Sequence, residues 1–214
     1  MTISTSTCSG RGHTEISFEV DDKIASTAHW IVDYFENQVQ AGVRFESEQT
    51  VQIGWMHVLL RLGTRCLEVW EPDFDAMPIR WCRGVNNTLR HLTLQRSICE
   101  MMKCDPVFPT IMHVGVVSPC FFSSDACTMS RDEVVGSDSG WVFAERGYCG
   151  KEGEFVSLYQ VALQKISVVP FLALPETAFI RIQRGQIEVT VGSVVASSQS
   201  NALLSQLGTE PILV

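Results

Sequence analysis

The stretch from Ser130 to Glu145 constrains the fold of this chain more than any other. Residues compatible with a strand, from Ala126 to Met129, lead into it, and residues 136–140 supply the glycine, serine and aspartate that tight turns favour. Trp141 and Phe143 then alternate onto one face of a returning strand. A large aromatic at the mouth of a strand can bury its ring while its indole N–H finds a partner. The segment therefore predicts strand, turn and strand, with Trp141 as a structural anchor.

The residues after this hairpin predict a short helix and two more strands. A charged loop, residues 146–153, is followed by a helix predicted over 156–166, in which apolar residues at 158, 161, 162 and 166 have helical spacing. Pro170 is expected to end that helix. Residues 178–182 and 187–191 then have strand character, and a turn at 184–186 joins them.

The motifs from residue 126 to residue 184 form a recognisable series. A Ser-Arg pair precedes an Asp-Ser-Gly-Trp block, after which come a glycine-containing loop, a short helix and a proline-bounded segment. This series resembles a domain found among bacterial polymorphic-toxin immunity proteins. As family signature residues, all with structural roles, the resemblance identifies Asp138, Ser139, Gly140, Trp141, Pro170 and Pro175.

The loop after the signature block departs from that family pattern. In the family this loop is usually strongly acidic, whereas here it carries Arg146 and Lys151 together with Glu152 and Glu154. The resemblance implies a protein that binds a toxin, so Glu152 and Glu154 are candidate contact residues.

Charge and composition restrict the function classes further. A formal net charge of −8 and a pI near 5.1 disfavour nonspecific binding to nucleic acid or acidic membranes, and favour a basic partner. No run of 18 apolar residues is present to span a bilayer, and the first residues have neither the basic nor the apolar region of a signal peptide. We therefore expect a cytoplasmic protein.

The eight cysteines are expected to be reduced and not to bind metal. Several lie within apolar segments, and the sequence contains no Cys-x-x-Cys. Cys99 and Cys104 have no second ligand pair with which to complete a zinc site. The sequence therefore predicts neither a metal nor a cofactor.

The first part of the chain predicts a tail, a strand and a helix. Residues 1–13 have the polar composition of a flexible tail, and residues 14–20 alternate as a short edge strand would. Apolar residues from 24 to 39 then recur at helical spacing, which predicts a helix over about 22–40. Asp21 or Asp22 is the expected N-cap, and Gly42 suits a left-handed C-terminal cap.

An acidic segment follows a predicted meander of strands at 43–45, 51–60 and 65–70. It is broken by a proline and holds four carboxylates within eight residues, from 68 to 75. Paired carboxylates can do acid–base chemistry or bind metals, but a solvated loop tip is the favoured interpretation. As candidate partner contacts we take Glu68, Glu71, Asp73, Phe74 and Asp75.

The only dense basic region of the chain precedes and enters a helix predicted over about 87–103. It contains Arg80, Arg83, Arg90, His91 and Arg96. Arginines beside a helix N-terminus can form an anion site, but pairing with the protein's own excess acids is favoured.

These elements together predict an α+β fold of two small packed halves, each a largely antiparallel sheet with one or two helices. Prolines at 106 and 109 mark the expected boundary, which gives halves of 14–107 and 108–214.

Two functions remain open at this point. The leading hypothesis is an immunity protein, not an enzyme, that occludes the active face of a cognate toxin, such as a nuclease effector of a type VI secretion system. The alternative is an enzyme or sensor that responds to a small molecule or nucleotide through the arginines at 80–96. No Gly-rich phosphate loop, Gly-x-Ser-x-Gly or His-Glu-x-x-His motif supports the alternative.

Overall fold

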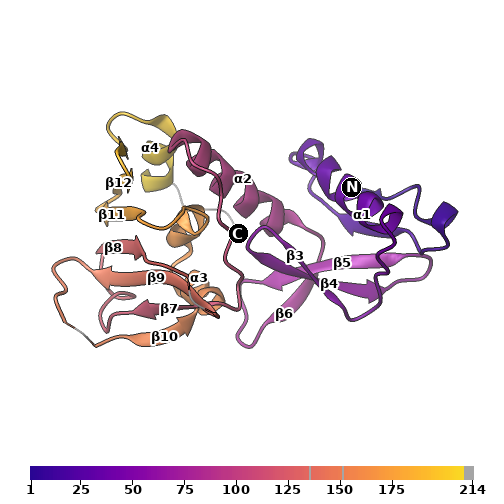
Figure 1. Ribbon diagram of the computed structural model, residues 1–214, viewed down its shortest axis with the longest axis horizontal. Helices are drawn as coiled ribbons and strands as arrows, with labels where there is room; N and C mark the ends of the chain where they lie inside the picture. Colours follow the sequence, from indigo (N-terminus) through magenta and orange to yellow (C-terminus); the bar gives the residue numbers. More distant parts are fainter. Residues whose placement is uncertain (135, 151, 210–214) are drawn as a thin grey trace. The chain divides into compact units, whose positions relative to one another are not determined.

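The computed structural model describes residues 1–134, 136–150 and 152–209 (Figure 1). The chain divides into two compact units, Met1–Leu92 and Thr93–Val214. The described residues form a six-stranded sheet in the first unit and a seven-stranded sheet in the second. The expected α+β class, with two mostly antiparallel sheets and few helices, is confirmed. The division falls within helix α2 (Asn86–Met101), before the prolines at which the sequence predicts a boundary.

The sheet of the first unit has the strand order β1-β2-β5-β4-β3, and β6 pairs with β5. Among its described strands only the β2–β5 pair is parallel. Gly54, with φ of 61°, makes the turn between β3 and β4, where the sequence predicts a continuous strand. The bounds are β1 Thr2–Ser4, β2 Ile16–Glu19, β3 Thr50–Ile53, β4 Met56–Leu62, β5 Leu67–Asp73 and β6 Arg80–Arg83.

The first residues of the chain are part of this sheet and not a tail. β1 pairs antiparallel with β2, with Ile3 opposite Phe18, and Cys8 is buried in the core. The side chain of Glu36 accepts hydrogen bonds from the backbone N–H groups of Ser6 (2.7 Å) and Thr7 (3.2 Å). Consequently β2 lies between β1 and β5, and is not the edge strand that its alternation alone predicts.

Helix α1 (His29–Gln40) buries Ile31, Phe35 and Val39 in the core of the first unit. It begins later than predicted, because residues 25–27 form a 3₁₀ turn. Neither predicted aspartate caps it: the carboxylate of Asp22 instead bonds to the N-terminal ammonium group of the chain, at 2.8 Å. Gly42 has φ of 94° after the last turn, as its position predicts.

The sheet of the second unit has the strand order β10-β7-β9-β8-β11-β12-β13. Among its described strands only the β7–β9 pair is parallel. The strand bounds are β7 Val114–Val117, β8 Ala126–Arg131, β9 Asp138–Glu145, β10 Glu154–Ser157, β11 Phe179–Gln183, β12 Gln186–Val191 and β13 Val194–Ser197. The helices are α3 (Leu158–Gln164), a 3₁₀ helix (Ile166–Phe171) and α4 (Ala202–Thr209).

Helix α3 starts two residues later than its apolar spacing predicts, because β10 occupies the residues before it. Ser157 caps it by accepting a hydrogen bond from the N–H of Gln160, at 3.2 Å. Pro170 does not end the helical segment, since the 3₁₀ helix runs through it. The predicted turn between β11 and β12 is confirmed, with positive φ at Arg184 (50°) and Gly185 (75°).

The β8–β9 hairpin confirms the predicted strand, turn and strand, with Arg131 opposite Trp141. Trp141 and Phe143 are both fully buried and stack with their ring centroids 6.1 Å apart. The indole N–H of Trp141 donates to the carbonyl oxygen of Leu172, at 3.1 Å. Trp141 therefore joins β9 to the 3₁₀ segment, as a core anchor should.

All eight cysteines fall within the described residues, and each is free. Cys8, Cys99 and Cys127 are buried, so these three act as small apolar core residues.

Replacing Trp141 with alanine should lower the free energy of unfolding by about 3–5 kcal/mol, because a large buried ring and its hydrogen bond are lost together. Urea denaturation followed by circular dichroism measures this change. Phe155→Ala, at an exposed position of the same sheet, is the matched control and should leave stability nearly unchanged. Equal stabilities of the two variants would contradict the structural role of Trp141.

Candidate functional site

The acidic segment from Glu68 to Asp75 is mostly strand and not a loop tip. β5 continues to Asp73, so successive side chains alternate between the two faces of the sheet. Alternation turns Glu71 inward, where it is only 2% exposed, and Phe74 is buried as well. Neither can touch a partner in this structure. Asp75 is exposed, and Glu68 and Asp73 are partly so.

Glu71 caps the N-terminus of α2 from a neighbouring strand. Its carboxylate accepts hydrogen bonds from the backbone N–H groups of Asn87 (2.9 Å) and Thr88 (2.7 Å), and from the hydroxyl of Thr88 (2.9 Å). Burial raises the pKa of Glu71, while these hydrogen bonds act in the opposite direction. The first N–H groups of a helix lack partners within the helix and favour a negative charge, so Glu71 has a structural role.

Phe74 and His91 belong to an aromatic cluster that also includes Trp55. The ring centroid of Phe74 lies 6.0 Å from that of Trp55 and 5.2 Å from that of His91. His91 is fully buried, and neither ring nitrogen has a hydrogen-bond partner within the described part of the chain. Desolvation lowers the pKa of His91 to about 3, so the ring is neutral near pH 7. His91 is therefore a core residue and cannot contribute positive charge to an anion site.

The arginines at 80–90 pair with the protein's own acids, which is the interpretation that the sequence favours. Arg80 binds Asp73 at 2.6 Å, and Arg90 lies 3.9 Å from Asp21. Arg83 binds Glu68 and also Glu19, the latter at 3.3 Å. Arg96 lies beyond Leu92, in the part of α2 that belongs to the second unit.

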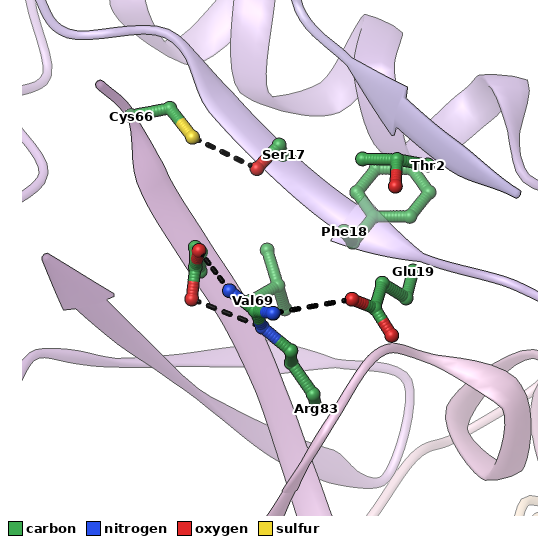
Figure 2. A pocket seen from close by; sticks show the side chains of 8 residues that line it. Thr2, Ser17, Phe18, Glu19, Cys66, Val69 and Arg83 are labelled. Carbon is green, nitrogen blue, oxygen red and sulfur yellow. Dashed lines mark hydrogen bonds and ion pairs between the residues drawn. The ribbon is translucent and has the colours of Figure 1, made fainter. Parts of the chain in front are cut away.

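A surface pocket of about 230 Å³ surrounds the paired Arg83 (Figure 2). Figure 2 shows the guanidinium of Arg83 directed toward the carboxylate of Glu19. Arg83 also forms an ion pair with the carboxylate of Glu68. On the other side of the pocket, the Ser17 hydroxyl and the Cys66 thiol form a hydrogen bond of 3.0 Å. The charged groups that line this pocket thus bond to one another. Arg83 therefore has fewer N–H groups with which to bind a small anion. Thr2, Phe18 and Val69 complete the lining.

The other predicted contacts, Glu152 and Glu154, lie at one edge of the second sheet. Both are exposed, and Glu154 begins β10, which pairs with β7 alone among the described strands. Phe155 follows, with 69% of its surface exposed. This phenylalanine is not among the contacts predicted from the sequence. The helix predicted from the apolar spacing overlaps the end of β10, so the strand is not recognised there. An exposed aromatic beside two acids is a stronger candidate contact than the acids alone.

The signature residues support the fold from inside the second unit. Asp138 accepts a hydrogen bond from the N–H of Gly140 (2.9 Å), and the Ser139 hydroxyl donates to the carbonyl of Val114 (2.7 Å). Gly140 has φ of 75°, and a side chain there would collide with the carbonyl oxygen of Asp132. Pro170 is buried in the 3₁₀ helix, and Pro175 is half-buried after it. The arrangement gives these residues structural roles.

Comparison with known proteins places a family match in the second unit. Residues 94–192 match the model of the Imm33-like domain. This match contains the whole series of motifs from 126 to 184 and supports an immunity-protein family. No solved structure matches.

A second similarity is partial. The chain is 26% identical over 88 residues to glutamate–tRNA ligase 1 of Anaplasma marginale (strain St. Maries). The aligned part is 39% of this chain and 20% of the ligase, so the chain spans about a fifth of that protein's length.

Two further findings concern the described residues alone. No group of three or more His, Cys, Asp or Glu side chains among them is placed to hold a metal ion. Within the same residues, no helix combines the length and the apolar character needed to cross a membrane.

Replacing Glu71 with alanine should lower the free energy of unfolding by about 1–3 kcal/mol, because buried N–H groups of α2 lose their acceptor. The matched control is Asp75→Ala, at an exposed acidic position of the same segment, which should change stability little. Chemical denaturation measures both. If the Glu71 variant is as stable as the control, the capping role is wrong.

His91 should make the protein less stable as the pH falls below 6.5, the ordinary pKa of histidine. The unfolded chain takes up a proton there that the folded chain refuses until about pH 3, so the free energy of unfolding rises with pH across this window. The slope should approach about 1.4 kcal/mol per pH unit.

Denaturation curves at several pH values should show a smaller slope for His91→Leu than for the wild type. His29→Leu, at an exposed position on α1, should keep the wild-type slope. Identical slopes in the wild type and both variants would show that His91 is not held neutral.

Proposed function

We propose that this protein is an immunity protein that binds a cognate bacterial toxin and neutralises it by covering its active face. The observation that carries the proposal is the Imm33-like match over residues 94–192, which lies wholly within the second compact unit. In this proposal the protein is a binding protein and not an enzyme, and it acts in the cytoplasm.

The charge of the chain supports a basic toxin, such as a nuclease effector delivered by a type VI secretion system. A net charge of −8 attracts a basic protein over a distance of about 8–10 Å at physiological salt. Of the acids that the sequence selects, Glu152, Glu154 and Asp75 are exposed and available for contact. Glu68 and Asp73 are partly exposed but engaged by arginines, so their contribution is smaller.

The alternative function, a sensor of a small molecule or nucleotide, has less support. It requires arginines free to bind an anion, whereas Arg80, Arg83 and Arg90 face carboxylates of the same unit. The similarity to a tRNA ligase covers about a fifth of that enzyme and supports no activity for this chain.

The proposal predicts that this protein protects cells from a toxin encoded beside its gene. Expression of the neighbouring gene product alone should stop growth, and co-expression of this protein should restore it. The purified pair should form a complex of fixed stoichiometry, measurable by light scattering after size exclusion. A Trp141→Ala variant, which lacks the core anchor, should protect less.

The control is an unrelated acidic protein of similar size, which should not protect. If well-folded protein neither binds any neighbouring gene product nor restores growth, the proposed function is wrong. Calorimetric titration with nucleotides then tests the sensor alternative directly.

A further inference from the structure

The strand register of the second sheet aligns a row of side chains across the whole sheet. Phe155 of β10 lies opposite Val116 of β7, which lies opposite Val142 of β9. From Val142 the row continues to Ser130 of β8 and then to Phe179 of β11. Side chains that are direct cross-strand partners point to the same face of a sheet. These residues therefore share one face.

The row ends on the last two strands and is open to solvent. Phe179 lies opposite Thr190 of β12, which lies opposite Val195 of β13, so each described strand of this sheet contributes one residue. Phe155, Phe179 and Val195 are 69%, 36% and 64% exposed, and the residues between them are half-buried. Five of the seven side chains are apolar.

The opposite face of the same strands forms the core of the unit. Its corresponding row contains Phe143, Met129, Ile180 and Val189, all fully buried. The 3₁₀ segment covers this core face, since Trp141 of β9 bonds to Leu172 immediately after it. The exposed row is thus on the face that the core packing does not use. Apolar side chains on that face therefore stay partly or largely exposed to solvent.

The row has the length of a protein–protein interface. Seven strands about 4.8 Å apart extend for about 29 Å. A standard interface buries about 800 Å² on each partner, which corresponds to a patch roughly 30 Å across. The next row along the strands is polar: Arg181 pairs with Glu188 at 3.2 Å, and its guanidinium lies 5.7 Å from the ring centroid of Phe179. An apolar row beside paired charges has the composition of an interface core and rim.

The β10 end of the row is acidic and carries an open strand edge. The N–H of Leu158 donates to the carbonyl of His113 at 2.8 Å, which fixes the alternation of hydrogen bonds between β10 and β7. By this alternation, the backbone N–H and C=O groups of Phe155 and Ser157 face away from β7. Glu152 and Glu154, both exposed, immediately precede Phe155 at this edge, and alternation along β10 turns Glu154 toward the opposite face from Phe155.

We propose that this row is the toxin-docking surface, with Phe155 as its anchor, and that it binds a toxin segment with apolar and basic side chains. This proposal rests on the proposed function and names the surface that performs it. Charge favours a basic toxin over a second copy of this chain. Each copy of this chain carries a formal net charge of −8, so two copies repel each other whereas a basic toxin is attracted.

The test measures binding of the neighbouring toxin to single-site variants by surface plasmon resonance. Phe155→Ser and Phe179→Ser should each weaken binding about tenfold or more, as loss of an interface anchor does. The matched control is Leu62→Ser, which changes an apolar side chain of the first unit that is 72% exposed and should leave affinity within twofold. Melting temperatures of all three should stay near that of the wild type.

A charge variant separates the two parts of the proposal. Glu152→Gln with Glu154→Gln should slow association and flatten its dependence on salt, with little change in the dissociation rate. An unchanged on-rate at low salt would show that these acids do not face the toxin.

Different failures have different meanings. If the wild type binds no candidate toxin, the proposed function itself fails and the docking surface fails with it. If the wild type binds and both phenylalanine variants bind equally well, only the docking surface is wrong. Light scattering tests whether a second copy of this chain occupies the row instead. The proposal would be overturned if the wild type is a dimer, Phe155→Ser makes it a monomer, and toxin binding is unchanged.

Discussion

The guanidinium of Arg131 lies buried among main-chain carbonyl groups at the centre of the second unit, with only 2% of the residue exposed. It donates to the carbonyl oxygens of Ser139 (3.1 Å) and Val107 (2.7 Å), and also to those of Leu172 and Leu174. Three separated stretches of chain are therefore held by one side chain. Burial lowers the pKa of Arg131 to about 10, so it keeps its charge at neutral pH.

That interaction explains why the signature residues occur together. An unpaired buried charge is costly, so the carbonyl groups must be presented with good geometry. Trp141 stacks on the guanidinium at 5.6 Å and bonds to one of the same residues, Leu172. The turn with Ser139 and Gly140 presents another carbonyl. The turn at Ser139 and Gly140 and the ring of Trp141 thus line a buried arginine site, on the side of the sheet opposite the exposed row.

The sequence predicts well those features that depend on neighbours along the chain. The β8–β9 hairpin, the left-handed Gly42 and the turn at Arg184 follow from local backbone chemistry. Glu71 could not be placed in the same way, because its partners belong to a helix that starts fifteen residues later and that only the folded sheet brings near. The exposed row could not be predicted from the sequence either, because its residues are brought into line only by the register of the seven strands.

The net charge of the chain therefore does not locate its binding site. Several acids interact with other groups of the same chain. Glu71 accepts hydrogen bonds from a helix N-terminus, and Glu68 and Asp73 form ion pairs with arginines. Glu152 and Glu154 remain beside an exposed phenylalanine on an edge strand, a position that by itself invites self-association. Charges on such an edge oppose pairing with another copy and attract a basic chain. On the proposed function, these two carboxylates have two effects. They oppose pairing of β10 with another copy while no toxin is bound, and they attract the basic toxin, so the apolar row can remain exposed without self-association.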